Sequence, residues 1–411
     1  MKTIALLLLL PVTLLAQETF EQPPALSAAA ILKPEFAAGT GFTVRDPVST
    51  YAGRNGYMID SDAGIFAADG NVMLMRRVQE IAAIAKLREV SRTDTYKNAL
   101  AAAATSPLLF GKGLITNPVD TVTGVPTGLW KVMHRAGQSV KERGQSRERS
   151  QYEDSNAAQL IGFAKVKRDM ALKLGVDPYS SNQELQRELN GVSWAAYAGK
   201  MTFTLATAPV GGAAGMALTS VGMSDTFTKA LRDQSPADLR LASLKRLLSL
   251  GCDKDAANSF LNNTAYSPSV QTALAMDLDS MKGVANRAAF IQLADSGSQS
   301  EGDANFYAQT ARILAELHNH GRTMARIVGL GALPVVIGAD GSLIVGLEWD
   351  YASWTQNAAA FAGQIKAAKV NGKAPSSIVV ALSGDASPMV QQNLKDAGIL
   401  LATRVAPGPL K

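Results

Sequence analysis

The spacing of hydrophobic positions along the chain changes twice, and each change marks the start of a new region. Residues 41–70 alternate short apolar runs with turn signals, among them Asn55-Gly56 and Asp69-Gly70. Alternation with a period of two, interrupted by such dipeptides, is typical of short antiparallel strands. This region is expected to form a small antiparallel sheet.

Residues 71–321 show the helical period instead, with apolar residues recurring three and four positions apart, as at Val78 and Ile81. Ser181 and Glu184 have the spacing of a capping box, which predicts the start of a helix. We expect a mainly α-helical central body. Its other predicted boundaries are the N-caps at Ser235-Pro236 and Ser267-Pro268 and the helix stops at Gly175, Gly251 and Gly321.

In residues 322–411 the pattern changes again. Two β-branched runs on either side of Asp340-Gly341 predict a hairpin, and a helix, a strand, a helix and a strand follow. The order β-β-α-β-α-β describes a small C-terminal α/β domain whose last strands are parallel and joined by a right-handed crossover. The predicted fold class is therefore α+β.

The amino terminus predicts export. Residues 1–16 contain a basic residue, Lys2, then an apolar run over residues 4–15, and a small residue, Ala16, before a polar stretch. This is the pattern of a secretory signal peptide, and the apolar run is shorter than the roughly 20 residues of a membrane span. Residues 17–40, rich in proline and alanine, are expected to be an extended linker. The expected location is secreted or periplasmic.

Composition narrows the function. The 411 residues are 47% hydrophobic and 18% charged, enough for more than one buried core. The net charge of +5, from 40 basic and 35 acidic residues, is too small for a large phosphate-binding surface, so nucleic acid is not an expected partner. The single cysteine, Cys252, is expected to be a buried small side chain. No nucleotide loop, nucleophile elbow or zinc-protease motif occurs, so no cofactor is predicted.

Two of the three histidines, His318 and His320, lie in "ELHNHG" at a predicted helix end. Residues two apart on a helix diverge by about 200°, so a shared metal ion would require the helix to unwind after them. With Glu348 or Asp350 as a further ligand, they would suit a metal-dependent hydrolase. The alternative is that polar side chains simply end the helix, where they interact favourably with its dipole.

Glu348 and Asp350 flank Trp349, which puts both carboxylates on one face of a strand about 7 Å apart. That separation is near the one used by acid/base pairs in glycosidases. Solvated acidic residues at a strand end are the simpler interpretation. No catalytic residue is therefore assigned from the sequence.

Two further stretches have alternative interpretations. Asp177, Tyr179 and Asn182 belong either to a corner between helices or to a polar binding surface. Residues 201–223 have no charge, and they are either a buried core helix or a membrane-active segment. Residues 124–150 have the mixture of apolar and basic side chains of an interfacial helix, so peripheral membrane contact is a second expectation. The leading prediction is an exported, envelope-associated, non-enzymatic structural or interaction protein of unknown partner.

Overall fold

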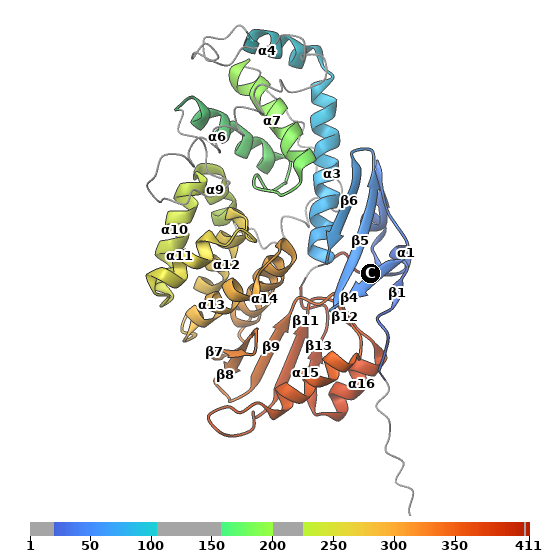
Figure 1. Cartoon of the computed structure of the whole chain (residues 1–411), viewed down its shortest axis with the longest axis vertical. Helices are drawn as coiled ribbons and strands as arrows, with labels where there is room; N and C mark the ends of the chain where they lie inside the picture. Colours follow the sequence, from blue (N-terminus) through green and yellow to red (C-terminus); the bar gives the residue numbers. More distant parts are fainter. Residues whose placement is uncertain (1–19, 105–157, 200–224, 407) are drawn as a thin grey trace, which may run out of the picture.

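The computed structural model describes residues 20–104, 158–199, 225–406 and 408–411, and it has an α+β fold. Figure 1 shows an antiparallel sheet at the start of the chain, a body of helices, and a second sheet with two helices at the end of the chain. The predicted fold class is confirmed.

The N-terminal sheet is built around β5. β6 pairs with one edge of β5, while β4 and β3 pair with successive parts of the other edge, and every pairing is antiparallel. β1 and β2 extend the sheet beyond β4 and β3. The strands are β1 (Ala25–Leu26), β2 (Ala38–Gly39), β3 (Phe42–Val44), β4 (Val48–Tyr51), β5 (Arg54–Ser61) and β6 (Gly64–Asp69).

The expectation of an extended linker over residues 17–40 is wrong for its described part, residues 20–40. Two short helices, α1 (Ala28–Ile31) and α2 (Pro34–Ala37), lie between β1 and β2. Leu32 and Phe36 are fully buried in the core of the N-terminal sheet. Pro34 starts α2, as proline does at a first helical position.

Asn55-Gly56 is not a turn, as the sequence pattern suggested. Both residues lie inside β5, and the chain reverses at Ala52-Gly53 instead. The Asn55 side chain is buried and hydrogen-bonded to neighbouring side chains, so tertiary contacts hold it in the strand.

The long helix α3 (Asn71–Ser91) connects the N-terminal sheet to the helical body (Figure 1). Its first half, with Leu74 and Val78, packs on the sheet. Its second half, with Ile84 and Leu87, packs against α4 and α7 in a core that also contains residues of α6. The apolar positions of this helix, which the helical spacing predicted, therefore belong to two different cores.

The predicted helical body is present throughout the described part of residues 71–321. Ser235 and Ser267 are N-caps before proline, as predicted, and Gly175, Gly251 and Gly321 follow helix ends with positive φ angles of 73°, 94° and 92°. After α3 the helices are α4 (Asp94–Ala104), α6 (Ala158–Lys173), α7 (Gln183–Ala198), α9 (Asp225–Asp233), α10 (Pro236–Ser249), α11 (Lys254–Asn262), α12 (Pro268–Ser280), α13 (Arg287–Gly297) and α14 (Glu301–Asn319).

The capping box predicted at Ser181 and Glu184 is not formed. Asn182 is the N-cap of α7, and its Oδ1 accepts hydrogen bonds from the N–H groups of Glu184 and Leu185. Ser181 lies one residue before this cap and donates its hydroxyl to Glu301 at 2.7 Å. Serine and asparagine cap helices about equally well, so contacts with another helix decide between them.

The C-terminal sheet has the strand order β13-β11-β9-β8-β7. β9, β11 and β13 are parallel, as predicted, while β7, β8 and β9 are antiparallel neighbours. The first predicted strand is in fact two, because the chain turns at Gly331, which has a φ of 60°. The elements are β7 (Met324–Leu330), β8 (Leu333–Gly338), β9 (Leu343–Leu347), β10 (Tyr351–Ala352), α15 (Gln356–Ala367), β11 (Ile378–Leu382), β12 (Asp385–Ala386), α16 (Pro388–Asp396) and β13 (Ile399–Ala402).

Both faces of this sheet are covered. Val336 and Ile344 point to the core formed with the helical body, while Val335 and Val345 point to the core under α15 and α16. This alternation follows from the period of two in a strand. α14 packs against β9 from the helical body, so the sheet lies between α14 on one face and α15 and α16 on the other (Figure 1).

Candidate functional site

The acidic pair that the sequence identifies lies at the carboxyl end of β9. The strand ends at Leu347, and Glu348 and Asp350 follow on either side of Trp349. The main-chain N–H of Asp350 donates to the carbonyl oxygen of Gly53, between β4 and β5, at 2.7 Å. The end of the C-terminal sheet is therefore in direct contact with a turn of the N-terminal sheet.

Asp350 binds main-chain N–H groups of the N-terminal region. Its Oδ2 accepts from the N–H of Asn55 in β5 at 2.8 Å, and its two oxygens lie 3.1 and 3.2 Å from the N–H nitrogen of Asn71, the first residue of α3. The N-cap of this helix is Gly70, which has no side chain to bind the free N–H groups. A carboxylate 279 residues away in the sequence takes that role, and the partial positive charge of the helix start favours it.

Glu348 shares this space with Asp350. A Cβ atom placed on Gly70 would lie 3.3 Å from Oε1 of Glu348 and 3.5 Å from Oδ2 of Asp350, so both carboxyl groups face the same point at the start of α3. Oε2 of Glu348 is buried and makes no hydrogen bond with any described residue. A buried carboxylate oxygen without a donor is costly when the group is ionised.

The cation nearest to the pair is Arg54 of β5. Its Cδ lies 4.0 Å from the same point beside Gly70, its Nη1 lies 3.2 Å from Asp69, and its Nη2 lies 3.8 Å from Asp303 in the first turn of α14. One guanidinium is therefore shared between the buried pair and two partly exposed carboxylates. It cannot neutralise both members of the pair.

Behind the pair, uncharged polar side chains form a chain of hydrogen bonds. The hydroxyl of Thr50 donates to Oδ1 of Asn55 at 2.9 Å, Nδ2 of Asn55 donates to the Tyr57 oxygen at 3.0 Å, and the Tyr57 hydroxyl donates to Oδ1 of Asn71 at 2.5 Å. Each of these side chains is buried. The chain of bonds fixes β4, β5 and the start of α3 relative to one another, and so positions the N–H groups that Asp350 binds.

Burial shifts the proton affinity of these groups. Burial, followed by the negative charge of Asp350, raises the pKa of Glu348 well above its usual value. Burial raises the pKa of Asp350 to about 7, although the N–H donors of Asn55 and Asn71 act in the opposite direction. Burial and the charge of Asp350 likewise raise the pKa of the Tyr57 hydroxyl.

The arrangement suits a structural junction better than acid/base catalysis. Two carboxyl groups with raised pKa values can in principle hold and release a proton near neutral pH. A general acid or base must, however, come within hydrogen-bond reach of a substrate. Glu348 and Asp350 are only 2% and 1% exposed, and Asp350 already binds main-chain N–H groups with both oxygens.

His318 and His320 are not brought together with this pair. They occupy the last turn and the C-cap of α14. The first turn of the same helix faces Arg54: a Cβ atom placed on Gly302 would lie 2.8 Å from Nη1 of Arg54. A helix of 19 residues is about 28 Å long, so the histidines and the acidic pair lie near opposite ends. Within the described residues no group of three or more His, Cys, Asp or Glu is placed to hold a metal ion. The structure therefore does not bring His318 and His320 together with Glu348 or Asp350, as the metal site considered from the sequence would require.

Asp177, Tyr179 and Asn182 occupy the corner between α6 and α7, where they make internal contacts. Asp177 accepts hydrogen bonds from the N–H of Tyr179 at 2.8 Å and from the hydroxyl of Ser269, and burial raises its pKa. Asn182 caps α7 and donates its Nδ2 to Glu80 of α3 at 2.9 Å. The Tyr179 side chain is buried against Phe227 and Leu231. All three side chains therefore make contacts within the helical body.

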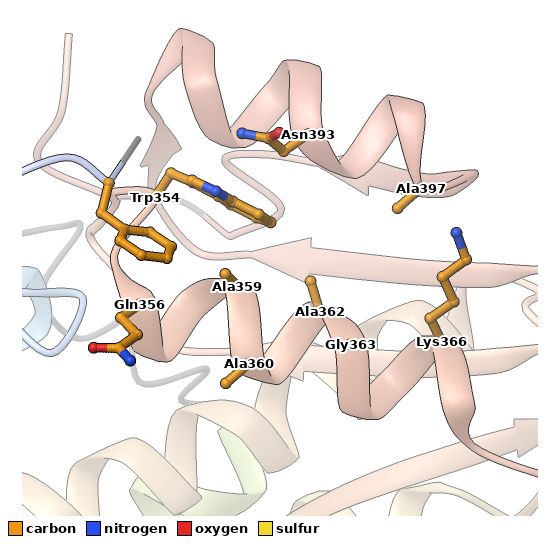
Figure 2. A pocket seen from close by; sticks show the side chains of 10 residues that line it. Trp354, Gln356, Ala359, Ala360, Ala362, Gly363, Lys366, Asn393 and Ala397 are labelled. Atoms are coloured by element: carbon orange, nitrogen blue, oxygen red, sulfur yellow. The ribbon is translucent and has the colours of Figure 1, made fainter. Parts of the chain in front are cut away.

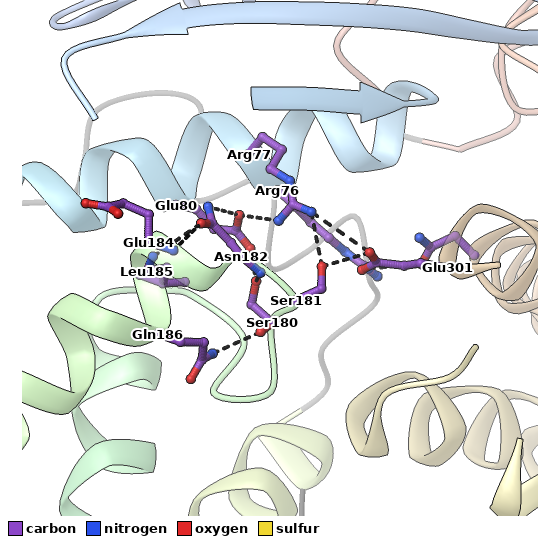
Figure 3. Close-up of polar contacts among 11 residues, drawn as sticks. Arg76, Arg77, Glu80, Ser180, Ser181, Asn182, Glu184, Leu185, Gln186 and Glu301 are labelled. Atoms are coloured by element: carbon purple, nitrogen blue, oxygen red, sulfur yellow. Dashed lines mark hydrogen bonds and ion pairs between the residues drawn. The ribbon is translucent and has the colours of Figure 1, made fainter. Parts of the chain in front are cut away.

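Figure 3 shows how this corner is joined to the neighbouring helices. Arg77 of α3 donates to Glu80 at 2.6 Å and to the Ser181 hydroxyl at 3.1 Å, and Ser181 in turn donates to Glu301 of α14. Ser180 also donates to Glu80. The network links α3, the α6–α7 corner and the start of α14, the helix that also supplies Asp303 to Arg54.

Reasoning from the sequence missed the residues on the N-terminal side of the junction. Arg54, Asn55 and Gly70 lie in a stretch that the pattern assigned only to turns and strands, and Asn71 was recognised only as the first residue of the predicted helical body. The available signal was a glycine at the N-cap of a long helix, a residue that has no side chain to accept a hydrogen bond from the first N–H groups. An acceptor from elsewhere in the chain can take that place.

A separate surface feature is a groove of about 430 Å³ between α15 and α16. Figure 2 shows Trp354 and Gln356 at one end of the groove and Lys366 and Ala397 at the other. The full lining is Phe20, Trp354, Gln356, Ala359, Ala360, Ala362, Gly363, Lys366, Asn393 and Ala397. Nothing in the sequence pattern singled out this surface.

Neither a protein-family model, nor a curated protein, nor a solved structure matches the chain. The predicted signal peptide, the basic apolar stretch at residues 124–150 and the uncharged residues 201–223 lie outside the described residues. Among the helices that are described, none is both long enough and apolar enough to cross a membrane.

Proposed function

We propose that the chain is an exported, envelope-associated protein with a non-enzymatic structural or interaction role. The observation that carries this proposal is the junction at Glu348 and Asp350. The most promising acid/base pair in the sequence is buried, and one of its members acts as the N-terminal ligand of α3. The pair joins the two sheets of the molecule rather than facing solvent.

The contacts of the other candidate residues support the same role. Asp177 and Asn182 hold a helix corner, and His320 is an exposed C-cap whose Nδ1 lies 2.8 Å from the carbonyl oxygen of Glu316. Cys252 is buried, and burial raises the pKa of its thiol to about 11, which keeps it protonated and poorly reactive at neutral pH. Export rests on the amino-terminal pattern of Lys2, an apolar run and Ala16.

Two isosteric substitutions test the non-enzymatic role. Glu348→Gln and Asp350→Asn remove the acid/base groups and keep the side-chain shapes. If the pair is structural, these substitutions should change only the amount of folded protein and should leave the function of each folded molecule unchanged. The measurement is complementation of a deletion strain, normalised to the folded protein recovered from the envelope fraction. Asp60→Asn, at an exposed ion pair with Arg45, is the matched control.

Catalysis would give a different result. Loss of an essential acid or base typically lowers a rate by a factor of about 10² to 10⁴. A fall of that size in a variant that remains folded would overturn the proposal.

Amino-terminal sequencing of the envelope fraction tests export. It should find a mature chain that starts near Gln17, and an intact chain retained in the cytoplasm would refute export.

A further inference from the structure

We propose that the groove between α15 and α16 binds an apolar peptide segment of a partner protein that also contains an acidic side chain. This inference rests on the proposed interaction role and names the surface and the class of partner. It depends on the floor of the groove, on a residue of this chain that already lines it, and on the charge at its far end.

The floor of the groove is formed by small residues. Four alanines and a glycine line it, namely Ala359, Ala360, Ala362, Ala397 and Gly363. A Cβ atom placed on Gly363 would meet no atom within 4 Å, so the surface is open above this position. Small residues on two adjacent helices leave a trough into which larger apolar side chains of another chain can pack.

Phe20 shows which chemistry the groove accepts. This phenylalanine comes from the start of the described chain and lines the groove together with Trp354. It is held there by Glu21, whose N–H donates to the Trp354 carbonyl oxygen at 2.9 Å and whose carboxylate accepts from the Trp354 N–H and the Ser387 hydroxyl, both at 2.5 Å. Phe20 is still 41% exposed, so an aromatic surface remains for a partner to cover.

The opposite end of the groove is positively charged. Lys366 is exposed there and makes no ion pair with any residue that the structure describes. An acidic side chain of the partner would complement it, and such a rim charge contributes mainly to specificity and to the rate of association. The distance along α15 from Gln356 to Lys366 is about 15 Å, which about five extended residues span.

The polar rims favour a peptide over a hydrocarbon chain. The amide side chains of Gln356 and Asn393 line the groove, and Asn393 uses its Nδ2 for the Met389 carbonyl oxygen, which leaves its Oδ1 as an acceptor. A peptide offers main-chain N–H and C=O groups to these amides. A hydrocarbon chain would cover them without replacing their hydrogen bonds to water, which costs free energy.

The test is selection of a displayed library of random linear peptides on the purified mature protein. Enriched peptides should combine aromatic or aliphatic residues with an aspartate or glutamate about five positions away. A synthetic copy of an enriched peptide should bind at least about tenfold more weakly to Gly363→Trp, in which an indole fills the groove. Lys366→Gln should weaken binding several-fold and remove its salt dependence.

Ala367→Trp is the matched control, because Ala367 is exposed on the same helix but does not line the groove. It should bind like the native protein, and equal thermal midpoints for both tryptophan variants show that both fold. No enrichment, or equal binding by Gly363→Trp, would overturn the inference. Groove-dependent binding to anionic phospholipid vesicles without peptide binding would also overturn it and assign the groove to lipid. These results leave the test at Glu348 and Asp350 unaffected, so the two proposals fail separately.

Discussion

At the scale of single residues, burial changes what the two carboxyl groups of the junction do. An exposed Glu348 and Asp350 would be ionised at neutral pH and solvated. In the folded chain they share one space at the start of α3, where the charges of Arg54 and Arg76 only partly offset the effect of burial on Glu348. The folded state therefore holds protons that the unfolded chain releases.

This proton uptake makes stability depend on pH. Folding raises the pKa of Asp350 from 3.8 to about 7 and also raises the pKa of Glu348. The contribution of the two protonated groups to the free energy of unfolding is therefore complete in acid and is lost as the pH rises through about 7. The free energy of unfolding should fall by up to about 1.4 kcal/mol per pH unit for each retained proton. Glu348→Gln removes one such group. The free energy of unfolding of this variant, measured by denaturant titration, should therefore fall less steeply from pH 5 to pH 8 than that of the native protein.

The control for this measurement is Asp60→Asn. Asp60 is exposed, and its hydrogen bond with Arg45 lowers its pKa, so its removal should leave the fall between pH 5 and pH 8 unchanged. If Glu348→Gln lost stability as steeply as the native protein over this range, the junction would not be the source of the pH dependence.

At the scale of elements, the start of α7 shows how contacts between helices choose among equivalent local signals. Ser181 and Asn182 are both suitable N-caps, and Glu184 completes a capping box only with Ser181. In the folded chain Glu184 instead pairs with Arg88 of α3, and Ser181 lies between Arg77 and Glu301. The helix therefore starts one residue later than the local pattern predicts.

Two alanine substitutions distinguish these starts. Asn182→Ala should lower the free energy of unfolding by about 1 to 2 kcal/mol, because it removes both the cap and the hydrogen bond to Glu80. Ser181→Ala removes only partly exposed contacts and should cost less than about 1 kcal/mol. Denaturant unfolding curves measure both values. A larger loss for Ser181→Ala would place the cap at Ser181.

At the scale of the whole molecule, a segment near the start of the described chain is hydrogen-bonded to the C-terminal residues. Leu32 pairs with Leu410, and the N–H of Lys33 donates to the Pro409 carbonyl oxygen at 2.8 Å. Together with the junction at Asp350, these contacts make the segment between β1 and β2 part of the folded structure. This segment is therefore not an extended linker.

Phe36→Ala tests this role. Phe36 is fully buried, and removing a buried phenylalanine side chain typically costs about 3 to 5 kcal/mol of stability, whereas a change in a linker costs almost nothing. Tyr51→Ala is the control on an 83% exposed aromatic residue of the same sheet and should stay within about 0.5 kcal/mol of the native protein. Calorimetric or denaturant unfolding compares the two. Equal small effects would restore the linker interpretation.

The sequence by itself determined the order and type of most elements. Period-two alternation, helical spacing, Ser-Pro helix starts and glycine helix stops are local properties, and they correctly predicted the antiparallel sheet, the helical body and the parallel strands β9, β11 and β13. They also identified Glu348 and Asp350 as the pair to examine. Local patterns suffice here because hydrogen bonding and burial within one element depend on neighbours in the chain.

Only the tertiary structure decided what that pair does. Its partners, Asn55 and Asn71, lie almost 300 residues earlier in the sequence, and no local pattern records that their N–H groups bind an acceptor from the segment after β9. The same holds for Asn55-Gly56, which hydrogen bonds to Tyr57 and Asp350 keep in a strand, and for the groove, which exists only because α15 and α16 lie side by side. Contacts between distant segments depend on how the elements pack, and packing is a property of the whole chain.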